Sequence, residues 1–158
     1  MGIGKSGERK DGKGPLPPVY LLLGISLQVG LHYVLPLATI IPPPYHWSGI
    51  AVIVLGVLII LFPAASFSKA DTTIIPFRES SSLVVSGLYR HTRNPMYLGM
   101  VLILSGVALL TGSLSPFVVP VLFVLVINRM IISVEERMLE RAFGDEYLAY
   151  KKTVRRWI

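Results

Sequence analysis

The sequence predicts an all-α integral membrane protein, with about four transmembrane helices and a cytoplasmic amphipathic C-terminal helix. Three observations point to this fold class. Of the 158 residues, 53% are hydrophobic and only 15% are charged, whereas a soluble domain carries about 25% charged residues. Apolar stretches long enough to cross a bilayer recur along the chain. The charged residues are gathered into separate segments outside those stretches.

One membrane domain, residues 18–158, is expected to follow a tail at residues 1–17. The tail is rich in Gly, Lys and Pro, which predicts a disordered cytoplasmic segment. Crossing the hydrocarbon core takes roughly 17–25 apolar residues. The third apolar stretch is short, so its first turn is expected in the membrane interface. The predicted spans are residues 19–41, 47–67, 95–110 and 116–134, followed by cytoplasmic helices at 135–158.

The distribution of charge predicts the topology. Every Lys, Arg, Asp and Glu lies in the N-terminal tail, in residues 68–94, or from Arg129 onward. The connections between spans one and two and between spans three and four carry no charge. Lys and Arg mark the cytoplasmic side of a membrane protein. We therefore expect both termini in the cytoplasm, and we attribute the net charge of +6 to the membrane surface rather than to nucleic acid.

The chain offers little for metal or thiol chemistry. It has no cysteine, which excludes disulfides and Cys-type zinc sites. His32, His46 and His91 are scattered, without the spacing of metal ligands. We therefore predict no metal site.

The first polar block, Ser81–Gly99, leads into the third span. Pro95 suits the first turn of a helix, because its missing N–H would be unpaired there anyway. Asn94 then falls at the N-cap, where its side chain is expected to accept from a free backbone N–H. The remaining N–H groups of this helix start, together with Arg93, suit an anionic group of a ligand. Tyr97 follows two residues inside the helix.

The second polar block continues the fourth span. At helical spacing, Asn128 and Glu135 are expected on one face. Gly144 is expected to break the helix, and the residues after it predict an amphipathic interfacial helix. Spans three and four form a hairpin with a short connection, so their inner ends must lie side by side. The sequence therefore predicts a polar pocket there, where Asn94 and Tyr97 meet the region from Arg129 to Glu136.

Two motifs carry a resemblance to a known family. "LVVSGLYRHTRNPMYLG" and, later, "EERMLERAFGDEYLAYKKTVRRW" resemble the isoprenylcysteine carboxyl methyltransferase and phospholipid methyltransferase superfamily, in its prokaryotic branch. The resemblance covers residues 71–158. It implies an integral membrane enzyme that uses S-adenosylmethionine and no metal, in a prokaryotic cytoplasmic (inner) membrane, with its active site facing the cytoplasm.

The resemblance also implies site residues. Both blocks would build the cofactor pocket, and the fourth span would close it. The implied catalytic residues are Arg129, Glu135 and Glu136. The implied cofactor-binding residues are Ser81, Ser82, Leu83, Val84, Tyr89, Asn94, Pro95, Met96, Tyr97 and Glu135.

The predicted function is methyl transfer from S-adenosylmethionine to a lipophilic acceptor that enters from the bilayer, similar to O-methylation of an isoprenylcysteine carboxylate. One alternative keeps the fold but methylates a phospholipid amine. Another is a non-enzymatic four-span transporter or scaffold, in which Glu135 and Glu136 would be a solvated helix end. Transporters usually carry ionisable groups near the midplane, and the middles of these spans have no Asp, Glu, Lys or Arg. The sequence leaves the oligomeric state open.

Overall fold

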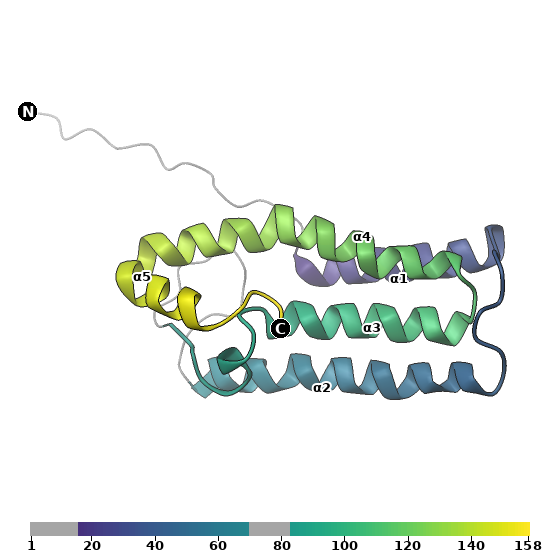
Figure 1. Ribbon diagram of the computed structural model, residues 1–158, viewed down its shortest axis with the longest axis horizontal. Helices are drawn as coiled ribbons and strands as arrows, with labels where there is room; N and C mark the ends of the chain where they lie inside the picture. Colours follow the sequence, from purple (N-terminus) through teal and green to yellow (C-terminus); the bar gives the residue numbers. More distant parts are fainter. Residues whose placement is uncertain (1–15, 70–82) are drawn as a thin grey trace, which may run out of the picture.

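The computed structural model describes residues 16–69, of which 63–69 by their backbone only, and residues 83–158. Most of the predicted tail and the residues Ser81 and Ser82 lie outside this part. The described chain is helical apart from short connections (Figure 1). The α-helices are α1 (Pro17–Val34), α2 (Ser48–Lys69), α3 (Pro95–Thr111), α4 (Val118–Ile127) and α5 (Ser133–Thr153). Between them lie 3₁₀ turns at Tyr45–Trp47, Gly87–Arg90 and Ser115–Phe117, and a π-helical turn, η4, at Asn128–Ile132.

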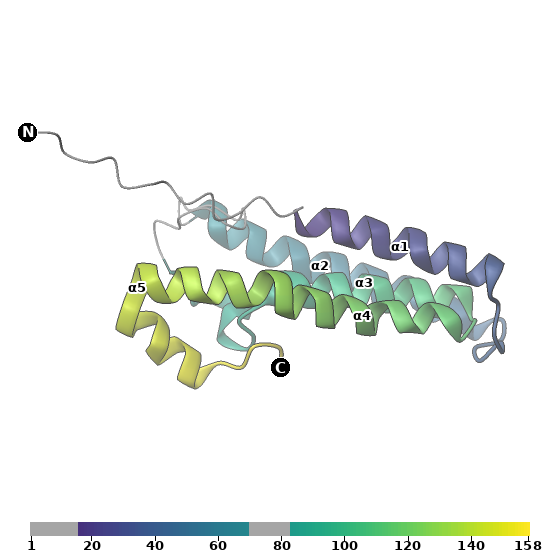
Figure 2. The same cartoon turned by 90° about the horizontal axis from the view of Figure 1, so that it is seen from above.

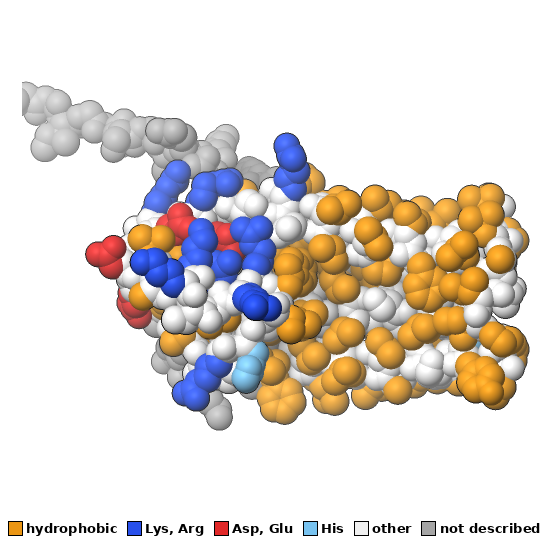
Figure 3. All heavy atoms as spheres, viewed as in Figure 1, with side chains coloured by type: hydrophobic (Ala, Val, Ile, Leu, Met, Phe, Trp, Pro, Cys, Tyr) orange, Lys and Arg blue, Asp and Glu red, His pale blue; other side chains and the backbone are white. Residues whose placement is uncertain are grey.

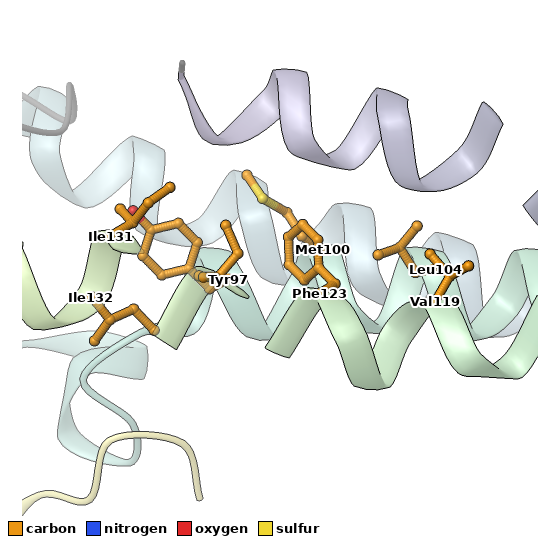
Figure 4. Packing of buried hydrophobic residues seen from close by; sticks show 8 residues of the cluster. Tyr97, Met100, Leu104, Val119, Phe123, Ile131 and Ile132 are labelled. Atoms are coloured by element: carbon orange, nitrogen blue, oxygen red, sulfur yellow. The ribbon is translucent and has the colours of Figure 1, made fainter. Parts of the chain in front are cut away.

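Helix α3 is the centre of the bundle. It packs along α2 on one side and against α1 and α4 on the other (Figures 1 and 2). Side chains from α3, α4 and η4 form the buried apolar cluster shown in Figure 4. The cluster runs from Leu104 and Val119 to Tyr97 and Ile132, so one continuous core leads to the start of α3.

Paired glycines set the close approach of α2 and α3. Gly49 faces Gly106, and Gly56 faces Gly99. A Cβ atom on Gly56 would lie 2.6 Å from the Gly99 carbonyl oxygen, and one on Gly49 would lie 2.4 Å from the Gly106 carbonyl oxygen. The glycines repeat every seventh residue on both helices, so they line one face of each. Small residues at such an interface let two membrane helices pack backbone against backbone.

The first helix is shorter than the predicted span 19–41. It begins at Pro17 and ends at Val34, because Pro36 has no N–H to continue the ladder and pushes Leu35 out of the helical region. The following chain crosses to the α3–α4 connection, where Ile40 donates its N–H to the Gly112 carbonyl (2.9 Å) and Leu114 donates to the Ala38 carbonyl (3.1 Å). Backbone hydrogen bonds therefore hold the α1–α2 connection against the α3–α4 connection at this end of the bundle.

The fourth span runs without interruption into the C-terminal helix. Its backbone hydrogen bonds change from the α-helical pattern in α4 to the π-helical pattern in η4, and return to the α-helical pattern in α5. Helix α5 bends at Gly144, whose φ of +51° is a conformation that favours glycine. This confirms the predicted break. After the bend the chain runs back towards the start of α3 (Figure 1).

The structure confirms the predicted fold class. Three described helical stretches, Pro17–Val34, Tyr45–Phe62 and Ser115–Thr153, are long and apolar enough to cross a membrane, and α3 is a shorter apolar helix. The apolar part of the longest stretch ends near Ile132. Charged side chains gather at the end of the molecule that carries α5, and apolar side chains cover the rest of the visible face (Figure 3).

Candidate functional site

A tyrosine and a glutamate meet at the boundary between the apolar core and the charged end. Tyr97 lies in the first turn of α3, and Glu135 lies in the first turn of α5. The Tyr97 hydroxyl donates a hydrogen bond to Glu135 Oε1 over 2.9 Å. The Tyr97 ring is only 7% exposed and lies beside Ile131 and Ile132 in the apolar cluster (Figure 4). The sequence predicted this meeting from the geometry of the hairpin.

Glu135 lies in an unusual electrostatic environment. Burial raises the pKa of its carboxyl group to about 7; the hydrogen bond from Tyr97 opposes this shift, and the neighbouring charge of Glu136 adds to it. In the described part of the chain, no Lys, Arg or His forms an ion pair with Glu135. The free Glu135 carboxyl group is therefore divided between its two protonation states near neutral pH.

Tyr89 lies near this pair, and Tyr150 in turn binds Tyr89. The Tyr150 hydroxyl donates to the Tyr89 carbonyl over 2.7 Å, which holds the end of α5 against the turn at Gly87–Arg90. Burial, followed by the charges of Tyr150 and Glu135, raises the pKa of Tyr89. Burial also raises the pKa of Tyr150 to about 12. Both phenols stay neutral at physiological pH, so each can donate a hydrogen bond.

Glu136, the next residue, lies in a different environment. Arg156 Nε donates to Glu136 Oε1 over 3.0 Å, and Arg156 Nη2 donates to Glu136 Oε2. Arg93 Nη1 lies 3.2 Å from Glu136 Oε1. Glu136 is only 6% exposed, and its charge is compensated by two guanidinium groups. The charge of Glu136, unlike that of Glu135, is therefore paired with cations of the described chain.

Asn94 occupies the predicted N-cap position, but the predicted cap is wrong. Its side chain makes no capping hydrogen bond. Instead, Asn94 Nδ2 donates to the Arg156 carbonyl over 2.9 Å. Thr92 Oγ1 accepts from the Asn94 N–H and donates to the same carbonyl, each over 3.2 Å. The Asn94 side chain therefore binds the C-terminal segment instead of capping α3.

The remaining predicted residues are spread around this centre. Pro95 is buried, whereas Met96, Leu83 and Val84 are half-buried. Leu83 lines an open groove that continues along Arg90 and Tyr150. Arg129 is exposed and takes no part in the ion cluster of Glu136. The structure thus brings together Tyr89, Tyr97 and Glu135, whereas Arg129 forms no ion pair within the described residues.

Sequence reasoning missed the part that Arg156 plays. It placed this residue near an interfacial helix, but α5 ends at Thr153 and Val154 is extended (φ −118°, ψ 132°). The one local signal was the pair of β-branched residues Thr153 and Val154, whose stiff side chains weaken a helix end. Nothing local indicated that the chain would return to α3.

The described residues contain no group of three or more His, Cys, Asp or Glu side chains that could hold a metal ion. Around the Tyr97–Glu135 pair, the site offers one carboxylate without an ion-pair partner in the described chain, neutral tyrosine hydroxyls and an apolar wall. Such a set can bind a ligand with polar and cationic groups on one side and keep water from the other.

Comparison with known proteins places the chain in a family. An uncharacterized protein of Haemophilus influenzae is 46% identical over 63 residues, which are 40% of this chain and the whole of that protein. No solved structure matches. Residues 44–146, more than half of the chain, match the phospholipid methyltransferase family. This segment includes α2, α3, α4 and both members of the Tyr97–Glu135 pair. The chain belongs to the phospholipid methyltransferase family, within the superfamily of membrane methyltransferases that also includes the isoprenylcysteine carboxyl methyltransferases.

Proposed function

We propose that this protein transfers a methyl group from S-adenosylmethionine to a lipophilic acceptor, at the charged end of its helix bundle. Glu135 is the observation that carries this proposal. Among the described residues, its partly buried carboxylate has a tyrosine as hydrogen-bond donor and no cation, whereas Glu136 has two arginines. A buried charge without a partner is costly. A ligand that brings a cation or several hydroxyl donors would offset this cost.

The residues present fit S-adenosylmethionine. Glu135 would accept from its ammonium group or its ribose hydroxyls, and Tyr89 and Tyr97 would border the same position. Leu83 and Val84 offer apolar surface to an adenine ring. Ser81 and Ser82 belong to the proposal through the family resemblance. Membership of a methyltransferase family supports the same cofactor.

Bound there, S-adenosylmethionine would supply an electrophilic methyl group, which passes to the acceptor as S-adenosylhomocysteine leaves. The protein would position and enclose the reactants rather than react itself. The hydroxyl of Tyr97 and the carboxylate of Glu135 would orient the cofactor. Buried apolar residues next to them, such as Met100 and Phe123, would exclude water.

The first candidate acceptor is a lipid that carries a carboxylate, as in the O-methylation of an isoprenylcysteine. A carboxylate is already a nucleophile, so the site needs no base. The exposed side chains of Arg90, in the turn before α3, and Arg129, in η4, would attract such an anion. The acceptor would enter from the bilayer between the spans.

The second candidate is a phospholipid amine, which the family description favours. A phospholipid amine is protonated near neutral pH, and this ammonium group must lose a proton before its nitrogen can act as a nucleophile. Glu135, with a pKa near 7, is a base of suitable strength for that step. The two candidates therefore differ in whether Glu135 only binds or also takes a proton.

We further propose that the charged end faces the cytoplasm, with both termini on that side of a prokaryotic cytoplasmic membrane. The one-sided distribution of Lys and Arg supports this orientation. The methyl acceptor would then meet its water-soluble cofactor at the cytoplasmic face.

The test measures binding first and transfer second. The purified protein in detergent is titrated with S-adenosylmethionine, and tritiated methyl transfer is then measured into a total lipid extract and into prenylcysteine analogues. Saturable binding with transfer to either acceptor supports the proposal, and the labelled product identifies the acceptor class. A folded protein that binds no S-adenosylmethionine would favour a transporter or scaffold.

A further inference from the structure

The five residues 154–158 form a strap that returns to the start of α3. The Arg155 carbonyl accepts from the Arg93 N–H over 3.0 Å. The Arg156 carbonyl accepts from Asn94 and Thr92, as described above. Trp157 packs against the apolar cluster that contains Tyr97. The backbone just before α3 is therefore held by this C-terminal strap.

The side chain of Arg156 reaches in the opposite direction, to the fourth span. Two of its nitrogens bind the Glu136 carboxylate, and the third, Nη1, donates to Asn128 Oδ1 over 3.0 Å. The hydrogen bonds to Glu136 raise the pKa of Arg156 further above its ordinary value. One residue therefore joins three places: the chain before α3, the π-helical turn and the first turn of α5.

These contacts flank the proposed cofactor site on both sides. Tyr97 follows Asn94 by three residues on α3, and Glu135 precedes Glu136 on α5. If the strap moved, the starts of α3 and α5 would keep the contact between Arg93 and Glu136 but lose the connections through Arg156. The distance from the Tyr97 hydroxyl to Glu135 would then be fixed by fewer contacts on this side.

We propose that Arg156 is a positioning residue, whose carbonyl and guanidinium group together hold the Tyr97–Glu135 pair in the arrangement that binds S-adenosylmethionine. This inference rests on the proposed function and adds a residue to it. Arg156 lies beyond residues 44–146, the segment that matches the family. Its role follows from the contacts of this chain alone.

The experiment compares Arg156→Ala, Arg156→Lys and the matched control Arg155→Ala. The control removes the same charge from the neighbouring residue, whose side chain is exposed and whose carbonyl is unchanged by the substitution. The dissociation constant for S-adenosylmethionine is measured by titration calorimetry in one detergent. Initial rates of methyl transfer are measured against the concentrations of cofactor and acceptor separately.

We expect Arg156→Ala to raise the dissociation constant and the KM for S-adenosylmethionine by roughly tenfold or more, since several charged hydrogen bonds are lost. The KM for the acceptor should stay within about twofold, as should every constant of Arg155→Ala. Arg156→Lys should fall between wild type and Arg156→Ala, because lysine keeps the charge but lacks the planar fork that binds Glu136 and Asn128 together.

Two results would overturn this role. In one, Arg156→Ala binds S-adenosylmethionine as tightly as Arg155→Ala does. In the other, kcat falls while the KM for S-adenosylmethionine stays unchanged, which would indicate a smaller folded fraction and a merely structural residue. If Arg156→Ala does not fold, Arg156→Lys and Asn128→Ala decide by the same comparison. Failure of the wild-type protein to bind S-adenosylmethionine would remove the proposed function itself, and this role with it.

Discussion

Glu135 and Glu136 are neighbours in the sequence, but the fold gives them opposite environments. Successive helical residues point about 100° apart, so one carboxylate faces Tyr97 and the other faces two arginines. Both are partly or fully buried, and only one has its charge compensated within the described chain. Removing the Glu135 carboxylate should therefore have a different consequence from removing the Glu136 carboxylate.

Glu135→Gln should weaken the binding of S-adenosylmethionine by roughly 10- to 150-fold, since a buried hydrogen bond to a charged group contributes about 1.5–3 kcal/mol. The variant should still fold, because glutamine can accept from Tyr97. Glu140→Gln is the control: Glu140 pairs with Lys151 on the partly exposed side of α5, and it should change binding little. Titration of both variants in one detergent checks this, and equal effects would place the site elsewhere.

Binding should also depend on pH through Glu135. The pKa near 7 applies to the free protein, and a cationic ligand selects the ionised form. Affinity should therefore rise with pH, by roughly tenfold from pH 6 to pH 8. The nearby phenols of Tyr89 and Tyr150 stay neutral in this range. Calorimetry across the range should show this rise in the wild type and a flat profile in Glu135→Gln, and a rise of the same size in the variant would assign it to another group.

The contact between α2 and α3 leaves no room for an additional side-chain atom at its glycines. A Cβ on Gly99 would lie 2.6 Å from the Gly56 carbonyl oxygen and 2.6 Å from Ile60 Cγ1. Gly99→Ala should therefore destabilise the bundle by about 1–3 kcal/mol through overpacking, and lower its thermal midpoint. Gly30→Ala, where no atom lies within 4 Å of the new Cβ, should leave the midpoint unchanged or raise it slightly. Similar losses in both variants would contradict the close packing.

The sequence predicted the helices well, because long apolar stretches and proline or glycine boundaries are local signals. It did not predict the π-helical turn. With regular α-helical spacing, Asn128 shares a face with Glu135, seven residues on. A π turn adds one residue to the helix, so Asn128 instead aligns with Glu136, and Arg156 binds both. The prediction of the facing pair Tyr97–Glu135 nevertheless succeeded, because it depended on the hairpin.

Other parts of the site depend on contacts between residues far apart in the chain. The local pattern assigned Asn94 to a cap, and the family resemblance implied a catalytic role for Glu136, but neither indicated that Arg156 binds these two residues. Arg156 lies 62 residues after Asn94 and 20 residues after Glu136, and it binds both of them. No periodicity or motif spacing reports such a return of the chain.

For the molecule as a whole, the orientation in the membrane is open to a direct test. The chain has no native cysteine, so single cysteines can be introduced without background. Tyr45→Cys, at an exposed position of the uncharged end, should react with a membrane-impermeant maleimide in intact bacterial cells. Ile158→Cys, exposed at the charged end, should react only after permeabilisation. The reverse pattern would invert the proposed topology.

The length of α3 has a consequence for the surrounding lipid. Its 17 residues rise about 1.5 Å each, which gives roughly 25 Å, whereas the hydrocarbon core is about 30 Å thick. Because α3 lies at the centre of the bundle, its start would lie below the level of the lipid head groups in a bilayer of that thickness. A thinner bilayer would bring the head groups of its leaflet to the level of Tyr97, so a lipid acceptor would reach the site without leaving its leaflet. Methyl transfer should accordingly be faster in vesicles of short-chain lipids than in long-chain ones at equal head-group composition, and equal rates would show that membrane thickness does not limit access.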